Sequence, residues 1–213
     1  MNIPKWISWA GLAAMIGGIL ASILTPPFAV AYFSAYPGYD IPPFWLQSVR
    51  PMLRPFLTFG SSVEVYNTYG RIYDFVYLLW LPAVFGLHHL HQVFSSRIEQ
   101  WGFGLLVVGL LATFIGVAGD YWADGAGFLL SLLGLLILYI GTTLYGVAIL
   151  RSNVIPRWCG WLLVSCLPGA FIFTWLIGHL PSGPTFPFAV SWLILGYILV
   201  FKKGIQREQH GAG

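Results

Sequence analysis

The sequence predicts an all-α integral membrane protein, a bundle of six transmembrane helices, and composition is the first reason. Hydrophobic residues make up 58% of the 213 residues and charged residues only 8%, whereas an ordinary soluble domain has about 25% charged residues. So few charges cannot cover a surface exposed to water, and we expect lipid to be the main solvent. No linker or charge run divides the chain, so residues 1–213 are expected to form a single transmembrane domain.

Six apolar segments are the second reason. A helix needs about 20 apolar residues to cross the hydrocarbon of a bilayer, and the candidates are residues 6–30, 71–94, 100–119, 127–150, 157–179 and 186–201. The first segment follows Lys5 in the manner of a signal peptide, but its apolar stretch is longer than that of a signal peptide. We therefore expect it to be a span.

The basic residues predict the orientation of the bundle. With both termini in the cytoplasm, seven of the ten basic residues fall on the cytoplasmic side: Lys5, Arg97, Arg151, Arg157, Lys202, Lys203 and Arg207. Cytoplasmic loops carry an excess of Lys and Arg, so we expect both termini to be cytoplasmic. The net charge of +3 is small and dispersed, which argues against binding to nucleic acid.

The connection over residues 31–70 is then extracytoplasmic, and it is rich in aromatic residues and proline. Trp45, Val49 and Leu53 recur at four-residue spacing, which suggests a short helix in the outer interface, broken near Pro51 and Pro55. The alternative is a loop anchored by its aromatic side chains.

A capping motif marks the start of the second span. Ser61 and Glu64 have the S-x-x-E spacing in which each side chain bonds the backbone N–H of the other residue. The motif predicts a helix that begins near Ser62, well before the apolar stretch at residue 71.

Glycines recur at seven-residue spacing in three spans, and seven residues make almost two helical turns. The sets are Gly102, Gly109 and Gly116; Gly127, Gly134 and Gly141; and Gly11 and Gly18 followed by Thr25. Each set lies on one helix face. Small residues allow helix backbones to approach closely in lipid, so we expect the third and fourth spans to form a tightly packed antiparallel hairpin.

Three of the five histidines lie close together at the end of the second span. His88 and His91 share a helix face, while His89 points away from them. A zinc site needs three or four ligands, and Glu99 is the only acidic residue nearby. We expect these histidines to mark the boundary between membrane and water, with a metal site at His88 and His91 only if a partner chain supplies further ligands.

Ionisable side chains gather at the outer ends of the spans and suggest a catalytic site of Asp74, Asp120 and His179. Ionisable residues within spans are functional candidates, and an imidazole with carboxylates is suited to acid–base catalysis. If this site exists, Asp74 and His179 should share a hydrogen bond, directly or through one water. The residues expected to bind ligand beside it are Arg71, Tyr69, Tyr73, Tyr77 and Trp122, with Tyr66 on the same helix face as the other tyrosines.

A purely structural interpretation of these residues is also open. Asp120 and Asp124 suit the capping of helices, Arg71 and Asp74 suit a local ion pair, and tyrosines suit an interfacial belt.

The stretch LYGVAILRSNVIPRWCGWLL covers residues 144–163. In it a span ends in a basic residue and Ser, I-P-R follows, and then come a Gly and a Leu-Leu pair. It resembles a signature of a family of small uncharacterised bacterial multi-pass membrane proteins. The resemblance covers about a tenth of the chain. It implies a protein of the bacterial cytoplasmic (inner) membrane and carries no activity or functional residues with it.

Three classes of function follow from these observations. The first is a non-catalytic subunit or a module that binds lipid or another hydrophobic ligand. The second is a membrane-embedded enzyme that acts on a lipid or isoprenoid at the outer face through Asp74, Asp120 and His179. The third is a small transporter or proton pathway. The expected partners are membrane lipids and other membrane subunits or a second copy of the chain, and the sequence indicates no particular cofactor.

Overall fold

The computed structural model describes residues 4–91, 96–123, 125–152 and 155–201. Over these residues it contains α-helices, one 3₁₀ turn and no strand: α1 (Lys5–Ala35), α2 (Leu46–Leu53), η1 (Arg54–Phe56), α3 (Ser62–His91), α4 (Arg97–Trp122), α5 (Phe128–Arg151), α6 (Arg157–Ile177) and α7 (Ser182–Phe201). All but α2 and η1 are long and apolar enough to cross a membrane, which gives the six expected candidate spans. The all-helical fold with six candidate spans is confirmed over the described residues, and its six apolar helices indicate a multi-pass membrane protein. Asp124, Lys202, Lys203 and Arg207 lie outside the described residues.

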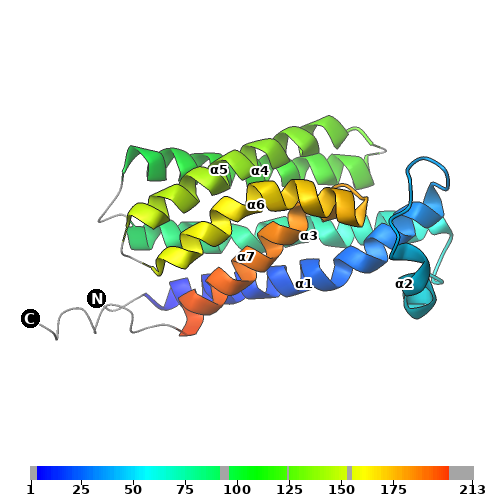
Figure 1. The fold of residues 1–213 in the computed structure, drawn as a ribbon, viewed down its shortest axis with the longest axis horizontal. Coiled ribbons are helices and arrows are strands. Elements are labelled where there is room, and N and C mark those ends of the chain that lie inside the picture. Colours follow the sequence, from blue (N-terminus) through cyan, green and yellow to red (C-terminus); the bar gives the residue numbers. More distant parts are fainter. Residues whose placement is uncertain (1–3, 92–95, 124, 153–154, 202–213) are drawn as a thin grey trace, which may run out of the picture.

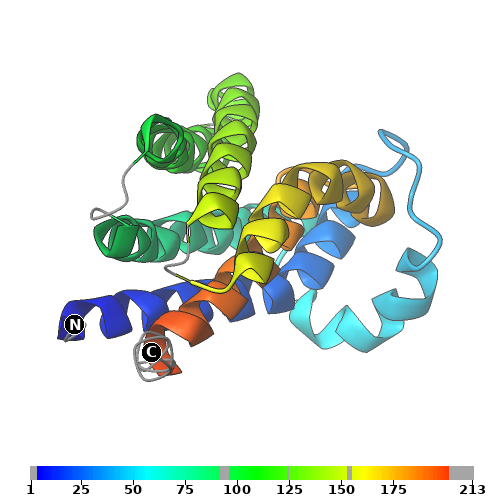
Figure 2. The same ribbon diagram turned by 60° about the vertical axis from the view of Figure 1, so that its left-hand side comes forward.

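The six long helices form a closed ring. Each packs against the next long helix along the chain, and α7 packs back against α1 (Figures 1 and 2). Gly11 of α1 lies beside Gly196 of α7, and Gly18 lies beside Ala189, so these two helices are antiparallel. The start of α1 and the end of α7 therefore lie at the same end of the bundle, opposite to α2 (Figure 1).

The start of α3 follows the predicted capping motif. The backbone N–H of Ser61 donates to the Glu64 carboxylate at 2.8 Å, and the backbone N–H of Glu64 donates to the Ser61 hydroxyl at 3.4 Å. The helix begins at Ser62 as expected and extends more than two turns before the apolar stretch that begins at residue 71.

The expected short helix is present as α2, which packs through Leu46 against Val30 and Phe33 of α1. The indole N–H of Trp45 donates to the Leu176 carbonyl at 2.7 Å and so holds this segment against the end of α6. The predicted break near Pro51 was wrong, because α2 continues through it to Leu53. The chain changes to a 3₁₀ turn only at Arg54, next to Pro55.

Close approaches of helix backbones coincide with glycines. A Cβ atom built on Gly102 would lie 2.7 Å from the Tyr145 nitrogen, and one on Gly141 would lie 2.5 Å from the Leu106 nitrogen. A Cβ on Gly109 would lie 2.5 Å from the Leu138 Cα. At these distances, no residue larger than glycine fits at these positions unless the backbones of α4 and α5 move apart. That this packing holds the bundle together in lipid stays a prediction.

We expect Gly109→Leu to lower the free energy of unfolding of the purified protein by about 1–3 kcal/mol, because the new side chain has to separate two backbones. Gly134→Leu should behave in the same way, since its Cβ would lie 2.7 Å from the Thr113 hydroxyl oxygen. The matched control is Gly104→Leu on the same helix as Gly109, because a Cβ at Gly104 meets no atom within 4 Å. Melting temperatures in detergent test the prediction, and equal values for Gly109→Leu and Gly104→Leu would contradict it.

Candidate functional site

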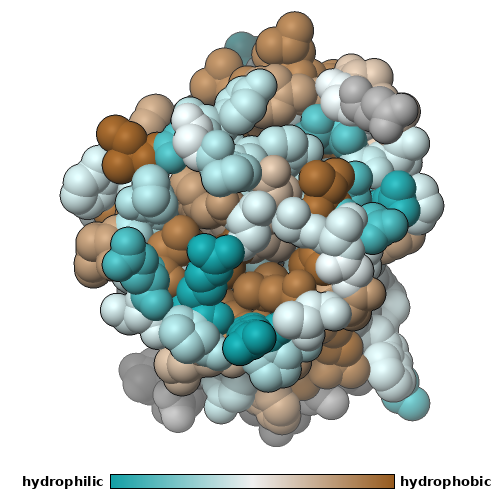
Figure 3. Space-filling model, turned by 90° about the vertical axis from the view of Figure 1, so that its right-hand side faces the viewer, coloured by the Kyte–Doolittle hydropathy of each residue, from teal (hydrophilic) through white to brown (hydrophobic). Residues whose placement is uncertain are grey.

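A large open cavity lies at the end of the bundle that carries α2. Its volume is about 1220 Å³, and its lining comes from the end of α1, the segment that follows it, the starts of α3 and α5, the end of α4, and the region from the end of α6 to His179 and Leu180. Figure 3 shows this end of the molecule, where hydrophilic residues surround a hollow with hydrophobic surface inside it. We call it the tyrosine cavity because five tyrosines line it: Tyr32, Tyr36, Tyr39, Tyr66 and Tyr121.

Two features of the helices bring these tyrosines together. Helix α1 extends to Ala35, five residues beyond the predicted span, and this extension carries Tyr32 to the cavity with Tyr36 directly after it. Helix α3 begins at its capping motif, and its first turns carry Tyr66 to the same place.

His179 lies at the inner wall of the cavity in the connection between α6 and α7, and its side chain is almost fully buried. Its Nδ1 atom hydrogen-bonds the Ser182 hydroxyl at 2.8 Å, and its Nε2 atom hydrogen-bonds the Tyr66 hydroxyl at 3.3 Å. The Tyr66 hydroxyl in turn bonds the Tyr121 hydroxyl at 2.9 Å. We call these four residues the His179 network. Hydroxyl groups both donate and accept, so either neutral tautomer of the imidazole is satisfied.

The environment of His179 favours the uncharged imidazole. Its ring packs against Phe28 at a centroid distance of 4.5 Å and against Tyr32 at 4.8 Å. Burial among these rings lowers the pKa of His179 from 6.5 to about 3, because the charged form loses its hydration. At neutral pH the network therefore presents hydrogen-bonding groups and no positive charge.

Asp120 lines the same cavity as His179, as expected, and is half-buried. The structural interpretation gave Asp120 and Asp124 as caps of the third and fourth spans, and Asp120 lies within the last turn of α4. Helix α5 begins after Gly127, which forms no side-chain capping bond.

Asp74 is not part of the cavity lining and is buried within the bundle. Asp74 and His179 share no direct hydrogen bond, because the two imidazole nitrogens bond Ser182 and Tyr66 instead. Among the described residues, the Oδ1 atom of Asp74 has no hydrogen-bond partner. The catalytic roles assigned to Asp74, Asp120 and His179 stay predictions, without the carboxylate–imidazole pair that motivated them.

Arg71 contacts the end of α4 and forms no ion pair with Asp74. Its Nε donates to the Tyr121 carbonyl at 3.0 Å, and its guanidinium lies 4.9 Å from the ring centroid of Trp122. Neither Arg71 nor Trp122 lines the cavity.

The other tyrosines of α3 connect helices and do not line the cavity. The Tyr69 hydroxyl donates to the Phe56 carbonyl at 2.9 Å, Tyr73 meets Thr25 at 3.4 Å, and Tyr77 meets Thr185 at 2.8 Å. The helix face that these tyrosines share therefore contacts η1, α1 and α7 in turn. Only Tyr66, near the start of α3, reaches the cavity at its end.

Sequence reasoning missed Tyr32, Tyr36, Tyr39 and Asp40, which contribute to the cavity wall. The Tyr32 hydroxyl donates to the Asp40 carboxylate. The four-residue spacing of Tyr32 and Tyr36 was a usable signal that the first helix extends beyond its apolar stretch.

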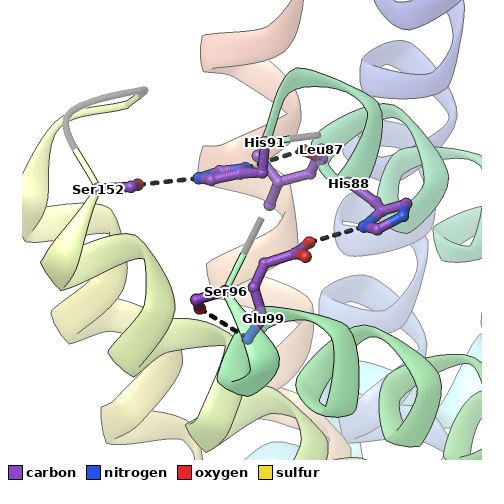
Figure 4. A network of polar contacts seen from close by, with 6 residues as sticks. All are labelled: Leu87, His88, His91, Ser96, Glu99 and Ser152. Atoms are coloured by element: carbon purple, nitrogen blue, oxygen red, sulfur yellow. Dashed lines mark hydrogen bonds and ion pairs between the residues drawn. The ribbon is translucent and has the colours of Figure 1, made fainter. Parts of the chain in front are cut away.

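The histidines at the opposite end of the bundle link three helices (Figure 4). His88 Nδ1 lies 2.6 Å from the buried carboxylate of Glu99, and its ring stacks on Phe103 at a centroid distance of 3.9 Å. His91 contacts the Leu87 carbonyl at 2.9 Å and the Ser152 hydroxyl at 3.1 Å. Within the described part of the chain, no group of three or more His, Cys, Asp or Glu side chains is placed to hold a metal ion. A metal ion shared with a partner chain stays untested.

The fold and the site define a multi-pass helical membrane protein with an aromatic cavity at one end of its bundle. No family model, curated protein or solved structure matches the chain. Its function is therefore inferred from the cavity and the residues around it.

The burial of His179 predicts how stability depends on pH. Between about pH 6.5 and about pH 3, an unfolded chain protonates this histidine while the folded protein keeps it neutral. The contribution of His179 is thus fully present above about pH 6.5 and declines as the pH falls, by up to about 1.4 kcal/mol for each pH unit. Melting temperatures from pH 7 to pH 4.5 should fall more steeply for the native protein than for His179→Gln, which retains a hydrogen-bonding amide. Parallel curves would contradict the prediction.

Proposed function

We propose that this multi-pass membrane protein is a non-catalytic module that binds a hydrophobic or amphipathic ligand in the tyrosine cavity. The observation that carries the proposal is the cavity itself. Its volume of about 1220 Å³ slightly exceeds the about 300–1,000 Å³ of common ligand pockets. Such pockets combine aromatic walls with a few polar groups that orient the ligand, and the five tyrosines with the His179 network supply both.

The rim of the cavity also suits a ligand that arrives from the membrane. Phe44 and Trp175 line the cavity and are each 81% exposed. Large aromatic side chains concentrate at the interface between membrane and water. These exposed aromatic side chains suit contact with the apolar part of a ligand that enters from the lipid.

An enzyme that acts on a lipid or isoprenoid remains the second hypothesis, since Asp120 and His179 line one cavity. General-base catalysis requires a base that a third group orients. Here Ser182 and Tyr66 orient the imidazole, and neither is a carboxylate that stabilises its protonated form. The transporter hypothesis gains no specific support from the described residues.

We infer that the protein lies in the cytoplasmic membrane of a bacterium with both termini in the cytoplasm. The basic residues Lys5, Arg97, Arg151 and Arg157 are terminal residues of α1, α4, α5 and α6. These helix ends lie at the end of the bundle opposite α2 (Figure 1). Their gathering at one end supports this orientation by the positive-inside rule. Membrane lipids are the proposed partners, together with other membrane subunits or a second copy of the chain.

Val63→Trp should weaken ligand binding because Val63 lines the cavity and is 43% exposed, so the larger side chain can take up space in the cavity without disturbing the core. Ile72→Trp is the matched control, since Ile72 lies on the same helix, is 47% exposed and does not line the cavity. Each protein is purified in mild detergent, extracted with organic solvent, and the extract analysed by mass spectrometry.

A hydrophobic compound should accompany the native protein and Ile72→Trp in near-stoichiometric amount and be depleted from Val63→Trp. Equal amounts in the two tryptophan variants would show that bound compounds lie on the outside of the bundle and would overturn the proposed function.

Cysteine labelling tests the orientation. The native Cys159 and Cys166 are fully buried, so a cysteine introduced at an exposed serine provides the reactive thiol. A cysteine in place of Ser48 on α2 should react with a membrane-impermeant maleimide in intact cells. One in place of Ser96, before α4, should react only after permeabilisation. The reverse pattern would show that the orientation is inverted.

A further inference from the structure

The charges around the tyrosine cavity are of one sign. Asp40 and Asp120 line it, and the described residues that line it include neither lysine nor arginine. A separate cavity of about 850 Å³ is lined by Arg50 and Arg54. Arg50 and Arg54 belong to the same connection between α1 and α3 as Asp40, yet they face a different cavity.

Nearby basic groups do not neutralise the two carboxylates. The guanidinium of Arg71 lies over the Trp122 ring, and its Nε bonds the Tyr121 carbonyl. His179 is buried and uncharged at neutral pH, for the reason given above. Within the described residues, the close contact found between a basic and an acidic side chain joins His88 and Glu99 at the opposite end of the bundle.

The tyrosine rings form one continuous wall next to these carboxylates. Tyr66 lies at its centre, with ring centroids 5.6 Å from Tyr32, 5.5 Å from Tyr36 and 5.3 Å from Tyr121. Tyr39 extends the wall at 6.1 Å from Tyr36. The face of an aromatic ring carries partial negative charge, and several rings around one space attract a cation, as in the cages that bind quaternary ammonium groups.

We propose that the ligand of the tyrosine cavity is an amphipathic molecule with an ammonium or quaternary ammonium head group. This inference rests on the proposed binding function. The rings and the carboxylates of Asp40 and Asp120 attract the head group, while the exposed Phe44 and Trp175 accommodate its apolar tail. A head group with negative charge meets two carboxylates and, among the described lining residues, no lysine or arginine, so it is disfavoured.

The test uses the full chain in dodecyl maltoside, a detergent that contains no ammonium group. The probe is radiolabelled dodecyltrimethylammonium, and empty micelles define the background. Its neutral counterpart carries a tert-butyl group in place of the trimethylammonium group, so size and shape are matched and only the charge differs. The native protein should bind the cation at least about tenfold more tightly than the neutral compound.

Two substitutions at one position separate the ring face from the hydroxyl group. Tyr36 lines the cavity and is half-buried. Tyr36→Leu should weaken binding of the cation by about tenfold, whereas Tyr36→Phe should bind it as the native protein does. Asp120→Asn should weaken binding of the cation without affecting the neutral compound, which provides a second test that leaves the rings in place.

The outcomes separate this inference from the function on which it rests. Equal affinity for the cation and the neutral compound overturns the inference and leaves a hydrophobic binding cavity. Equal loss in Tyr36→Leu and Tyr36→Phe overturns the role of the ring face. Binding of neither compound above the level seen with Val63→Trp overturns both the inference and the proposed function.

Discussion

The hydrogen bonds of His179 join the parts of the bundle that meet at the tyrosine cavity. Ser182 begins α7, Tyr66 belongs to α3 and Tyr121 to α4, while Phe28 of α1 packs against the imidazole. Polar groups buried without partners are costly, and this cost is greatest where neither water nor headgroups can replace them. The network satisfies its members with one another, so the helix ends are held in one arrangement. Three residues of this network, Tyr66, Tyr121 and His179, form part of the cavity wall.

The other walls of the cavity depend on the close approach of the helices and on the segment with α2, which packs over the helix ends. Backbones meet where glycine leaves room, as at Gly11 and Gly196 between α1 and α7. Helix α2 is held by Leu46 against α1 and by Trp45 against the end of α6. The segment that contains it thus contacts both α1 and α6, and it carries Tyr39 and Asp40 into the cavity lining.

Much of the fold could be predicted because lipid imposes simple rules on length and hydrophobicity. The six spans and the start of α3 at Ser62 follow from apolar length and one capping motif. The site was harder to predict because position along a span indicates depth but not the direction of a side chain. Asp74 and His179 were expected to meet because both lie near the outer ends of their spans, yet Asp74 lies outside the cavity lining. Tyr32 and Tyr36 were missed because a hydrophobicity rule ends the first helix where polar aromatic residues begin, whereas α1 continues to Ala35.

A density map of the protein, purified with its native lipids and determined without added ligand, would show whether a ligand occupies the tyrosine cavity. We expect elongated density inside the tyrosine cavity, with one end against Tyr36, Tyr66 and Asp120 and the other directed past Trp175 toward the lipid. The His179 network should be intact in the same map. A cavity that contains only ordered water, or one that is closed by movement of the α2 segment while lipid-like density lies elsewhere, would contradict this expectation.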